Sequence, residues 1–177
     1  MDINLLVKLT SRAWSLNILA LLHRGTPGRQ ASLLAATNAG RTAFAASLDH
    51  LIELGVVEKN PGHGHPLRPE FRLTEQGKAL GQIAHRIVSI VPEEQEFALL
   101  RRSWTVPVLT LTEAPQRFSD LRTKLVPITD RALSGALQKL ENRNWIRREV
   151  ITTTRTPFPI YNAINRGHDI ARAIHGP

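Results

Sequence analysis

Apolar and polar positions follow the same order of periods in the two halves of this chain. In the first half, apolar residues recur at the spacing of one helix face, then in two short strand-like runs, then at helical spacing again. Gly55 stands just after the third helical run, where a positive φ costs least. The predicted elements of this half are helices over about 14–22, 29–36 and 41–54, strands at 56–59 and 70–74, and a helix over about 74–87. The stretch 60–69 between the strands is too rich in proline and glycine to be regular, and is predicted as a loop.

The second half repeats this order. Its predicted elements are helices over roughly 102–112, 116–125 and 129–143, strands at 145–151 and 158–164, and a closing helix over 165–175. Thr129 is the predicted N-cap of the third helix, with Asp130 favourably placed near the positive end of that helix. Between the halves, the stretch 85–100 contains Pro92 and an acidic run. It predicts a helix end, a short break and a new helix start.

The halves also match residue by residue. Arg12-Ala13-Trp14 returns ninety positions later as Arg102-Ser103-Trp104. A period of this length indicates two copies of one small domain, which we place at 1–90 and 91–177. Domains of about 80 residues are marginally stable alone, so we expect the copies to pack on each other.

Three helices followed by a two-stranded hairpin is the plan of the winged helix-turn-helix. In that plan the third helix enters the DNA major groove, and the hairpin wing lies along the backbone or minor groove. The predicted fold class is therefore mainly α with small β-hairpin wings (α+β), built as tandem winged helix-turn-helix domains that form a pseudo-dimer. The alternative is a small α+β domain without a nucleic-acid role.

Composition agrees with a DNA-binding module. The chain has 23 Lys and Arg against 15 Asp and Glu, a formal charge of +8 that is divided evenly between the halves. A phosphate-binding surface has this composition, although some merely soluble proteins share it. The lack of cysteine excludes disulfides, thiolate zinc sites, thiol catalysis and thiol redox sensing. Since no signal-peptide pattern and no apolar run of about 18 residues is present, we expect a soluble, cytoplasmic protein.

A family resemblance rests on three motifs. They are Arg12-Ala13-Trp14, Leu73-Thr74-Glu75-Gln76-Gly77 and Pro115-Gln116-Arg117-Phe118-Ser119-Asp120-Leu121. The chain resembles the HxlR branch of MarR-like regulators over about 11–84 and again over 101–174. The resemblance implies a bacterial transcription regulator that binds palindromic operators, in a family whose members are usually single-domain homodimers. Two departures change that expectation: the redox cysteine common in the family is missing, and two fused copies can form their own pseudo-dimer.

In the second copy, the third helix carries the predicted base contacts. Leu133, Ala136, Leu137 and Leu140 mark its buried face, and the opposite face carries Arg131, Ser134, Gly135, Gln138 and Asn142. Arginine pairs with guanine, and glutamine or asparagine with adenine, while serine bonds either bases or phosphate. The alternative is an ordinary solvated polar face. The predicted phosphate contacts of this copy come from the helix N-terminus, the preceding helix and the wing, namely Thr129, Arg117, Arg122, Lys124, Arg147, Arg148 and Arg155.

The corresponding helix of the first copy is a weaker candidate. Its exposed positions include Thr42, Asp49 and Glu53, and carboxylates facing a phosphate backbone are unfavourable. The predicted DNA contacts of this copy are Arg41, Thr42, Lys59 and Arg68. We therefore expect the second copy to dominate affinity, while the first reads a degenerate half-site or mainly supports packing.

Other chemistries find little support. His63 and His65 are spaced as two metal ligands, but no third ligand lies nearby, so no metal site is predicted. There is no glycine-rich phosphate loop, nucleophile elbow or pair of acids with a plausible base, so we predict neither catalysis nor a cofactor. The three tryptophans, Trp14, Trp104 and Trp145, are predicted core anchors and not ligand cages.

The sequence therefore predicts a sequence-specific, double-stranded DNA-binding transcription regulator. The alternative is a tandem winged-helix scaffold that binds protein, or an architectural protein of chromosome or plasmid maintenance. The expected partner is double-stranded DNA, with a small-molecule or protein effector left open. A monomeric pseudo-dimer and a homodimer both fit.

Overall fold

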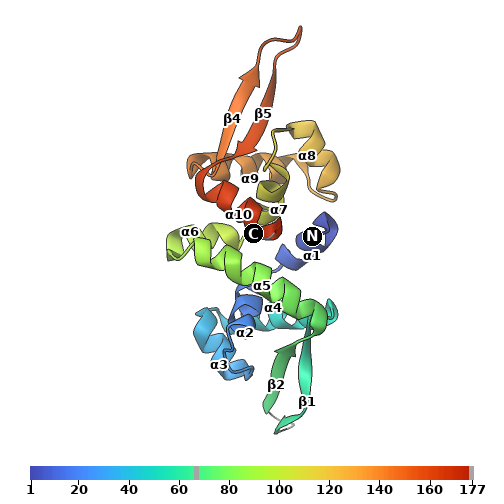
Figure 1. Ribbon diagram of the computed structural model, residues 1–177, viewed down its shortest axis with the longest axis vertical. Helices are drawn as coiled ribbons and strands as arrows, with labels where there is room; N and C mark the ends of the chain where they lie inside the picture. Colours follow the sequence, from blue (N-terminus) through green and yellow to red (C-terminus); the bar gives the residue numbers. More distant parts are fainter. Residues whose placement is uncertain (66–67, 176–177) are drawn as a thin grey trace. The chain divides into compact units, whose positions relative to one another are not determined.

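The chain folds into two compact units. The computed structural model describes residues 1–65 and 68–175, without the side chains of 61–68. One unit, the first-copy unit, is Arg12–Phe97. The other, the second-copy unit, combines Met1–Ser11 with the chain from Ala98 onward. Each unit contains helices and one small antiparallel sheet, so the α+β fold class predicted for both copies is confirmed (Figure 1).

The first-copy unit has the predicted order of elements. They are α2 (Ser15–His23), α3 (Gln30–Thr37), α4 (Arg41–Glu53), β1 (Val57–His65), β2 (Arg68–Leu73) and α5 (Glu75–Ile90). Its core is made by the apolar face of each helix, including Ile18, Leu33, Phe44 and Leu51, which are fully buried. The long helix α5 packs mainly against α2. Apolar spacing was therefore a sufficient guide to these helices.

The wing of the first-copy unit differs from its prediction. The stretch 60–69 was predicted as an irregular loop, but β1 continues to His65 and β2 begins at Arg68. The antiparallel register shifts between Lys59 and Gly64. A bulge of this kind, in a two-stranded hairpin, accommodates proline and glycine without ending the ladder. The loop prediction is therefore wrong for the described backbone of this segment.

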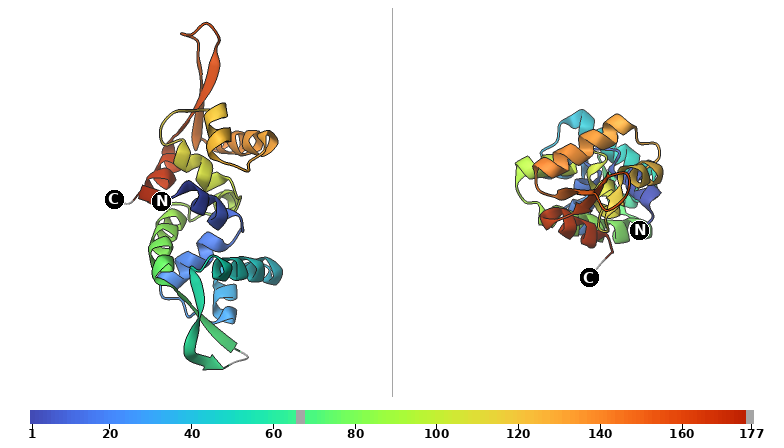
Figure 2. Two further views of the ribbon diagram at one scale, coloured as in Figure 1. Left: turned by 90° about the vertical axis from the view of Figure 1, so that its right-hand side faces the viewer. Right: turned by 90° about the horizontal axis from the view of Figure 1, so that it is seen from above.

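The second-copy unit repeats the plan with one additional strand. Its elements after residue 97 are the end of α6 (Glu94–Leu100), α7 (Thr105–Leu111), β3 (Gln116–Arg117), α8 (Phe118–Lys124), α9 (Asp130–Asn142), β4 (Ile146–Ile151), β5 (Phe158–Ala163) and α10 (Asn165–His175). The sheet has the order β3–β5–β4. The β4–β5 hairpin stands out from the helices of its unit in both side views (Figure 1, Figure 2).

The start of the predicted helix 116–125 is corrected to a strand. Gln116 and Arg117 pair with Tyr161 and Ile160 of β5, and the helix begins only at Phe118. In the first-copy unit Arg29 occupies the same position as an isolated bridge to Glu70. Helical spacing alone cannot reveal that these residues are held extended by a strand distant in the sequence.

An N-terminal helix that the sequence did not predict belongs to the second-copy unit. Helix α1 (Ile3–Thr10) buries Leu6 and Leu9 and packs against α7. The Thr10 hydroxyl oxygen lies 2.8 Å from the carbonyl oxygen of Ser103. The domain division at 90/91 stays a prediction, and the compact units show that the first eleven residues fold with the second copy. The break expected around Pro92 is confirmed, since α5 ends at Ile90 and α6 begins at Glu94.

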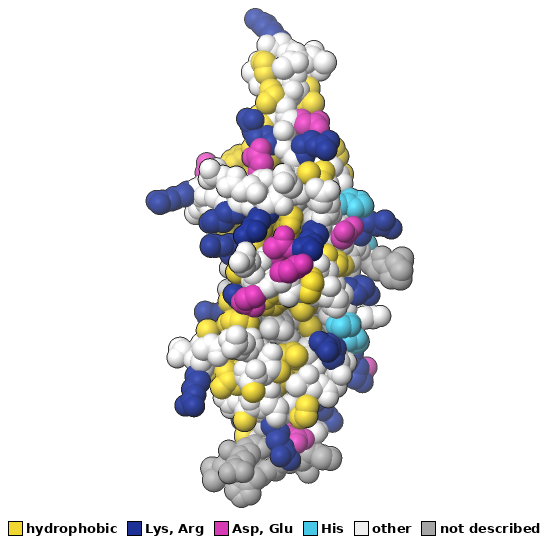
Figure 3. Space-filling view, turned by 90° about the vertical axis from the view of Figure 1, so that its left-hand side faces the viewer, with side chains coloured by type: hydrophobic (Ala, Val, Ile, Leu, Met, Phe, Trp, Pro, Cys, Tyr) yellow, Lys and Arg dark blue, Asp and Glu magenta, His cyan; other side chains and the backbone are white. Residues whose placement is uncertain are grey.

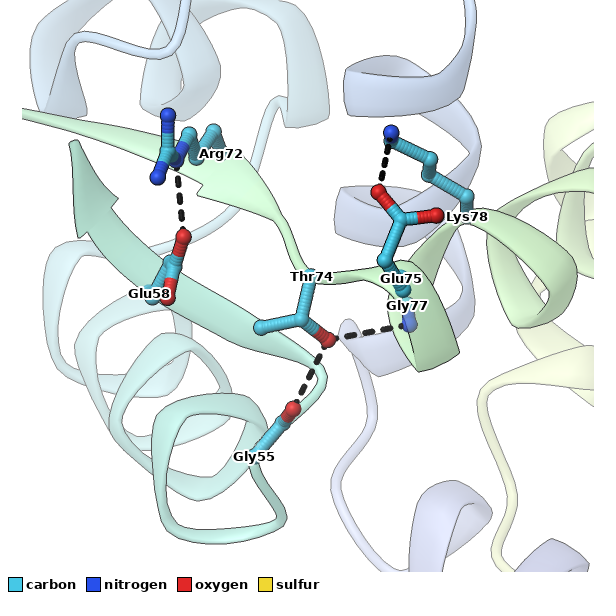
Figure 4. Close-up of polar contacts among 7 residues, drawn as sticks. All are labelled: Gly55, Glu58, Arg72, Thr74, Glu75, Gly77 and Lys78. Atoms are coloured by element: carbon cyan, nitrogen blue, oxygen red, sulfur yellow. Dashed lines mark hydrogen bonds and ion pairs between the residues drawn. The ribbon is translucent and has the colours of Figure 1, made fainter.

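Both units lock the end of their third helix to the start of their closing helix. In the first-copy unit the Thr74 hydroxyl donates to the carbonyl oxygen of Gly55 at 2.8 Å and accepts from the Gly77 N–H at 3.1 Å (Figure 4). Gly55 has φ +69°, as predicted for a helix C′ residue. A Cβ at Gly77 would lie 1.9 Å from the carbonyl oxygen of Val56, so only glycine fits there. The motif Leu73–Gly77 therefore has a structural role, because it holds the start of α5 against the residues that follow α4.

The second-copy unit makes the same lock with different side chains. Asn144, at φ +55°, takes the place of Gly55. The Asn165 side-chain amide donates to the Asn144 carbonyl oxygen at 3.0 Å. Gly167 lies against Trp145, where a Cβ would be 2.0 Å from the carbonyl oxygen. Of the three predicted tryptophan anchors, Trp145 is fully buried, while Trp14 and Trp104 are half-buried.

Candidate nucleic-acid interface

Helix α9 presents the predicted polar face to solvent. Its N-cap is Thr129, as expected, whose hydroxyl accepts from the Ala132 N–H at 3.2 Å. Leu133, Leu137 and Leu140 are buried, whereas Ala136, predicted on the same face, is only half-buried. The residues predicted to contact bases, Arg131, Ser134, Gln138 and Asn142, are all exposed, and Gly135 is half-exposed. The spacing i, i+3, i+7 and i+11 places these four side chains in one stripe along the helix.

Strand β3 and helix α8 hold the three basic side chains predicted to contact phosphate from this part of the unit, Arg117, Arg122 and Lys124. The Arg117 guanidinium lies 3.6 Å from the centre of the Phe158 ring. Stacking fixes the plane of the guanidinium and leaves its edge for a phosphate oxygen. Lys124 donates to Gln116 Oε1 at 2.9 Å and is exposed. Nearby, Arg122 is tied to Asp130 at 2.7 Å, a partly exposed pair that tethers α8 to the start of α9.

The register of the β4–β5 wing separates two arginines that the sequence places side by side. Arg147 pairs across the ladder with Asn162, and Arg148 with the buried Tyr161. Because successive strand residues point to opposite faces, the two arginines lie on opposite faces of the hairpin. Arg147 forms an exposed ion pair with Glu149 at 3.5 Å. Arg155 lies in the exposed turn between the strands.

Helix α4 of the first-copy unit matches α9 in length and core but not in surface. Thr42, Asp49 and Glu53 are exposed, and Arg41 is exposed at its start. The two carboxylates expected on this face are therefore present. Lys59 is exposed on the wing, opposite Phe71. The side chain of Arg68, like those of His63 and His65, lies outside the described residues.

Two basic hollows were not found by sequence reasoning. In the first-copy unit, a hollow of about 640 Å³ lies at the start of α3 and α4 and is lined in part by Arg29, Gln30, Ser32 and Arg41. Arg29 also forms an ion pair with Glu70 at 3.2 Å. The sequence did contain one indication of this hollow, because Arg29 aligns with Arg117, a predicted phosphate contact of the second copy.

The second hollow, which we call the α9 groove, lies in the second-copy unit and measures about 530 Å³. It is bounded by Arg131, Gly135 and Lys139 on α9, and by Arg102 and Trp104 on the segment before α7. Neither Arg102 nor Lys139 was predicted from the sequence to bind DNA; Arg102 was noted only as part of the repeated motif Arg102-Ser103-Trp104. Figure 3 shows Lys and Arg side chains on the wing and below it in the upper part of the view, with Asp and Glu side chains between them.

Other kinds of site find no support in the described part of the chain. There, no group of three or more His, Asp or Glu side chains could hold a metal ion. No single described helix is long and apolar enough to cross a membrane, and one bent pair, Ile3–Thr10 with Ser15–His23, passes by length and composition only.

Three helices, a hairpin wing and an exposed polar third helix define a winged helix-turn-helix protein. The model of the family "HxlR-like helix-turn-helix" matches residues 9–96 and again residues 99–176. The chain belongs to the HxlR-like helix-turn-helix family, with two copies in tandem, and the resemblance carried by its motifs is confirmed. The family is one of DNA-binding transcription regulators and not of enzymes. A comparison with curated proteins finds no match.

Proposed function

We propose that this protein is a sequence-specific regulator that binds double-stranded DNA with both winged helices as an intramolecular pseudo-dimer. The observation that carries the proposal is the comparison of α4 with α9. Both helices have thirteen residues and bury leucines at equivalent positions. Their exposed faces differ, because Arg131, Ser134 and Gln138 stand where α4 has Thr42, Ala45 and Asp49.

The second-copy unit reads the bases. Arg131 suits the two acceptors of guanine, and Gln138 suits the donor and acceptor of adenine in the major groove. Ser134 lies between them on the same stripe. Phosphates are bound beside this stripe by Thr129, Arg117 and Lys124, and by the wing through Arg147 and Arg155, while Arg148 lies on the opposite face of the wing.

The first-copy unit binds mainly the backbone. The carboxylates of Asp49 and Glu53 repel phosphates and accept few contacts from bases, so this face reads little sequence. Arg41 and Thr42, beside the hollow at the start of α3 and α4, supply phosphate contacts, with Lys59 and Arg68 on the wing. The second-copy unit therefore recognises the base sequence, and the first-copy unit adds contacts to the DNA backbone.

Unlike units imply unlike half-sites. Two recognition helices about 34 Å apart address successive major grooves on one side of the duplex. Because only one helix carries a strong reading face, the preferred site is an imperfect palindrome or a pair of unequal half-sites. Such a regulator works where the DNA is, in the bacterial cytoplasm.

Selection of sites from random duplex DNA tests the proposal directly. The expected result is one conserved half-site and one degenerate half-site at a fixed spacing of about one helical turn. Selection of no sequence, with binding to random duplex at low salt, would limit the protein to an architectural role. No binding to any duplex at low salt would overturn DNA binding altogether.

A second function is favoured by one observation. Asp49 and Glu53 form an exposed acidic face on α4, which is better suited to a basic protein surface than to DNA. A tandem winged-helix scaffold that binds protein through the first-copy unit would use that face. Capture of a basic partner that depends on both carboxylates, without DNA binding, would support this scaffold.

A further inference from the structure

The α9 groove has the composition of an anion site. Arg102, Arg131 and Lys139 are exposed along it, and Arg101 also lines it. Among the described residues that bound the groove, none is acidic. The rest of its wall includes the large apolar side chains of Leu99 and Trp104, and small or hydroxylated residues such as Gly135, Ala136 and Ser103. Small side chains permit the close approach of a large anionic chain.

The groove follows one flank of the reading helix. Gly135 and Lys139 follow Arg131 by four and eight residues, so they are turned by about 40° and about 80° from it, toward one flank of the base-reading stripe. The opposite flank is marked by Asp130, which is bound to Arg122 of α8. Lys139 is eight residues beyond Arg131, which is about 12 Å along the helix axis. The cations are therefore spread over the length of the groove.

A helix in the major groove has a sugar–phosphate backbone on each side. An α-helix with side chains is about 10–12 Å across, and the major groove is about 12 Å wide. When Ser134 and Gln138 face the bases, α8 and its cations lie toward one strand. The other flank, with Arg102 and Lys139, must then lie toward the other strand. None of the phosphate contacts predicted from the sequence lies on this flank of α9, so they do not account for contacts between this flank and the second strand.

We infer that the α9 groove binds the phosphates of the second DNA strand, with Arg102 and Lys139 as positioning residues for base reading by α9. This inference rests on the proposed function and adds to it a second wall of backbone contacts. Arg131, at the border of stripe and groove, takes part in both. The groove residues contribute affinity and register but no base preference.

The salt dependence of binding tests the inference. Each phosphate contact that is lost lowers the slope of log K against log salt by roughly 0.9 on duplex DNA. Arg102→Gln and Lys139→Gln should each reduce the slope by about that amount, and the double variant by roughly 1.8. Binding to the selected site and to random duplex should weaken together. Arg102→Lys and Lys139→Arg should keep the wild-type slope.

Matched variants separate this inference from the proposed function. Arg172→Gln, an exposed cation on α10 outside the groove, removes the same charge and should leave the slope unchanged. A wild-type slope for the Arg102→Gln/Lys139→Gln variant, while Arg131→Ala still abolishes site preference, would overturn the groove and leave the function intact. Absence of DNA binding by the unaltered chain would overturn both.

Binding of free inorganic phosphate is the last test. Suppose that phosphate, at constant ionic strength, quenches tryptophan fluorescence saturably and that the Arg102→Gln/Lys139→Gln variant loses this quenching. Suppose also that this variant keeps the wild-type salt slope of DNA binding. The groove would then be a small-anion pocket, and the inference would fail. Competition of phosphate with DNA, together with the expected change of slope, would support it.

Discussion

The hydroxyl of Thr74 donates a hydrogen bond to the carbonyl oxygen of Gly55, the residue two positions after the end of helix α4. The same hydroxyl caps α5 through the Gly77 N–H. One side chain thus fixes the end of the recognition helix to the start of the closing helix. Asn165 and Asn144 make the equivalent connection in the second-copy unit. The two copies therefore preserve this connection while the residues that make it have changed.

Replacement of Thr74 tests the connection. Thr74→Val keeps the shape but removes both hydrogen bonds, and it should destabilise the first-copy unit by about 1–2 kcal/mol. Thr74→Ser keeps the hydroxyl and should lose much less. Urea unfolding with separate probes for the two units measures the difference. Equal stability of the valine and serine variants would show that the hydroxyl contributes nothing.

Two glycines should respond to alanine in opposite directions. At Gly77 an added Cβ would lie 1.9 Å from the carbonyl oxygen of Val56, so α5 must move, and we expect a loss of about 1–3 kcal/mol. At Gly135 a Cβ meets nothing within 4 Å, so alanine should stabilise α9 by up to about 1 kcal/mol. Thermal unfolding measures both. A destabilised Gly135→Ala variant would contradict the open surface described for α9.

The same Gly135→Ala variant also probes DNA approach. A methyl group there projects between the base-reading stripe and the α9 groove. A more stable protein with weaker DNA binding is therefore expected. Unchanged binding, measured by gel shift at moderate salt, would mean that the duplex does not come close to this turn of α9.

The sequence predicted the helices well because their apolar spacing is local information. It missed α1 because the packing partner of that helix is α7, and the contact of Thr10 with Ser103, just before α7, spans 93 residues. It missed β3 because two residues carry no periodicity, and only pairing with Tyr161 and Ile160 makes them a strand. Both errors concern elements that are defined by a distant partner.

The candidate site was predicted to a similar extent. The stripe from Arg131 to Asn142 follows from helical period alone, so the sequence was sufficient to find it. The opposite orientation of Arg147 and Arg148 depends on ladder register, which the sequence does not state. Tertiary packing places Arg102 and Lys139 on one groove, and no local pattern joins two such positions.

Base reading by α9 should be selective at single positions. Gln138→Ala should relax the preference at one base pair of the strong half-site, by about 1–3 kcal/mol of discrimination. Lys124→Ala should instead weaken binding equally across sequences. Site selection with each variant separates the two effects. A uniform loss for Gln138→Ala would place that side chain on the backbone and not on a base.

The two wing arginines should not be equivalent. Arg147 lies on the same sheet face as Arg117, since Glu149 and Arg117 both pair with Ile160 of β5. Arg148 lies on the other face, with Tyr161. We expect Arg147→Ala to lower the salt slope by roughly 0.9 and Arg148→Ala to leave it unchanged. Equal effects would mean that the hairpin inserts with both faces against DNA.

Removal of negative charge from α4 should strengthen DNA binding. Asp49→Asn and Glu53→Gln keep the size of each side chain and abolish its repulsion of the nearby phosphates. Affinity for random duplex should rise roughly two- to fivefold at low salt, and the gain should fade as salt screens the charges.

The matched control is Asp169→Asn, an exposed carboxylate on α10, which should leave affinity unchanged. Equilibrium binding at two salt concentrations gives the comparison. If Asp49→Asn and Glu53→Gln change DNA affinity no more than this control, α4 does not face the duplex. A carboxylate close to phosphates must repel them measurably at low salt. Such a result would therefore favour a protein partner for the acidic face.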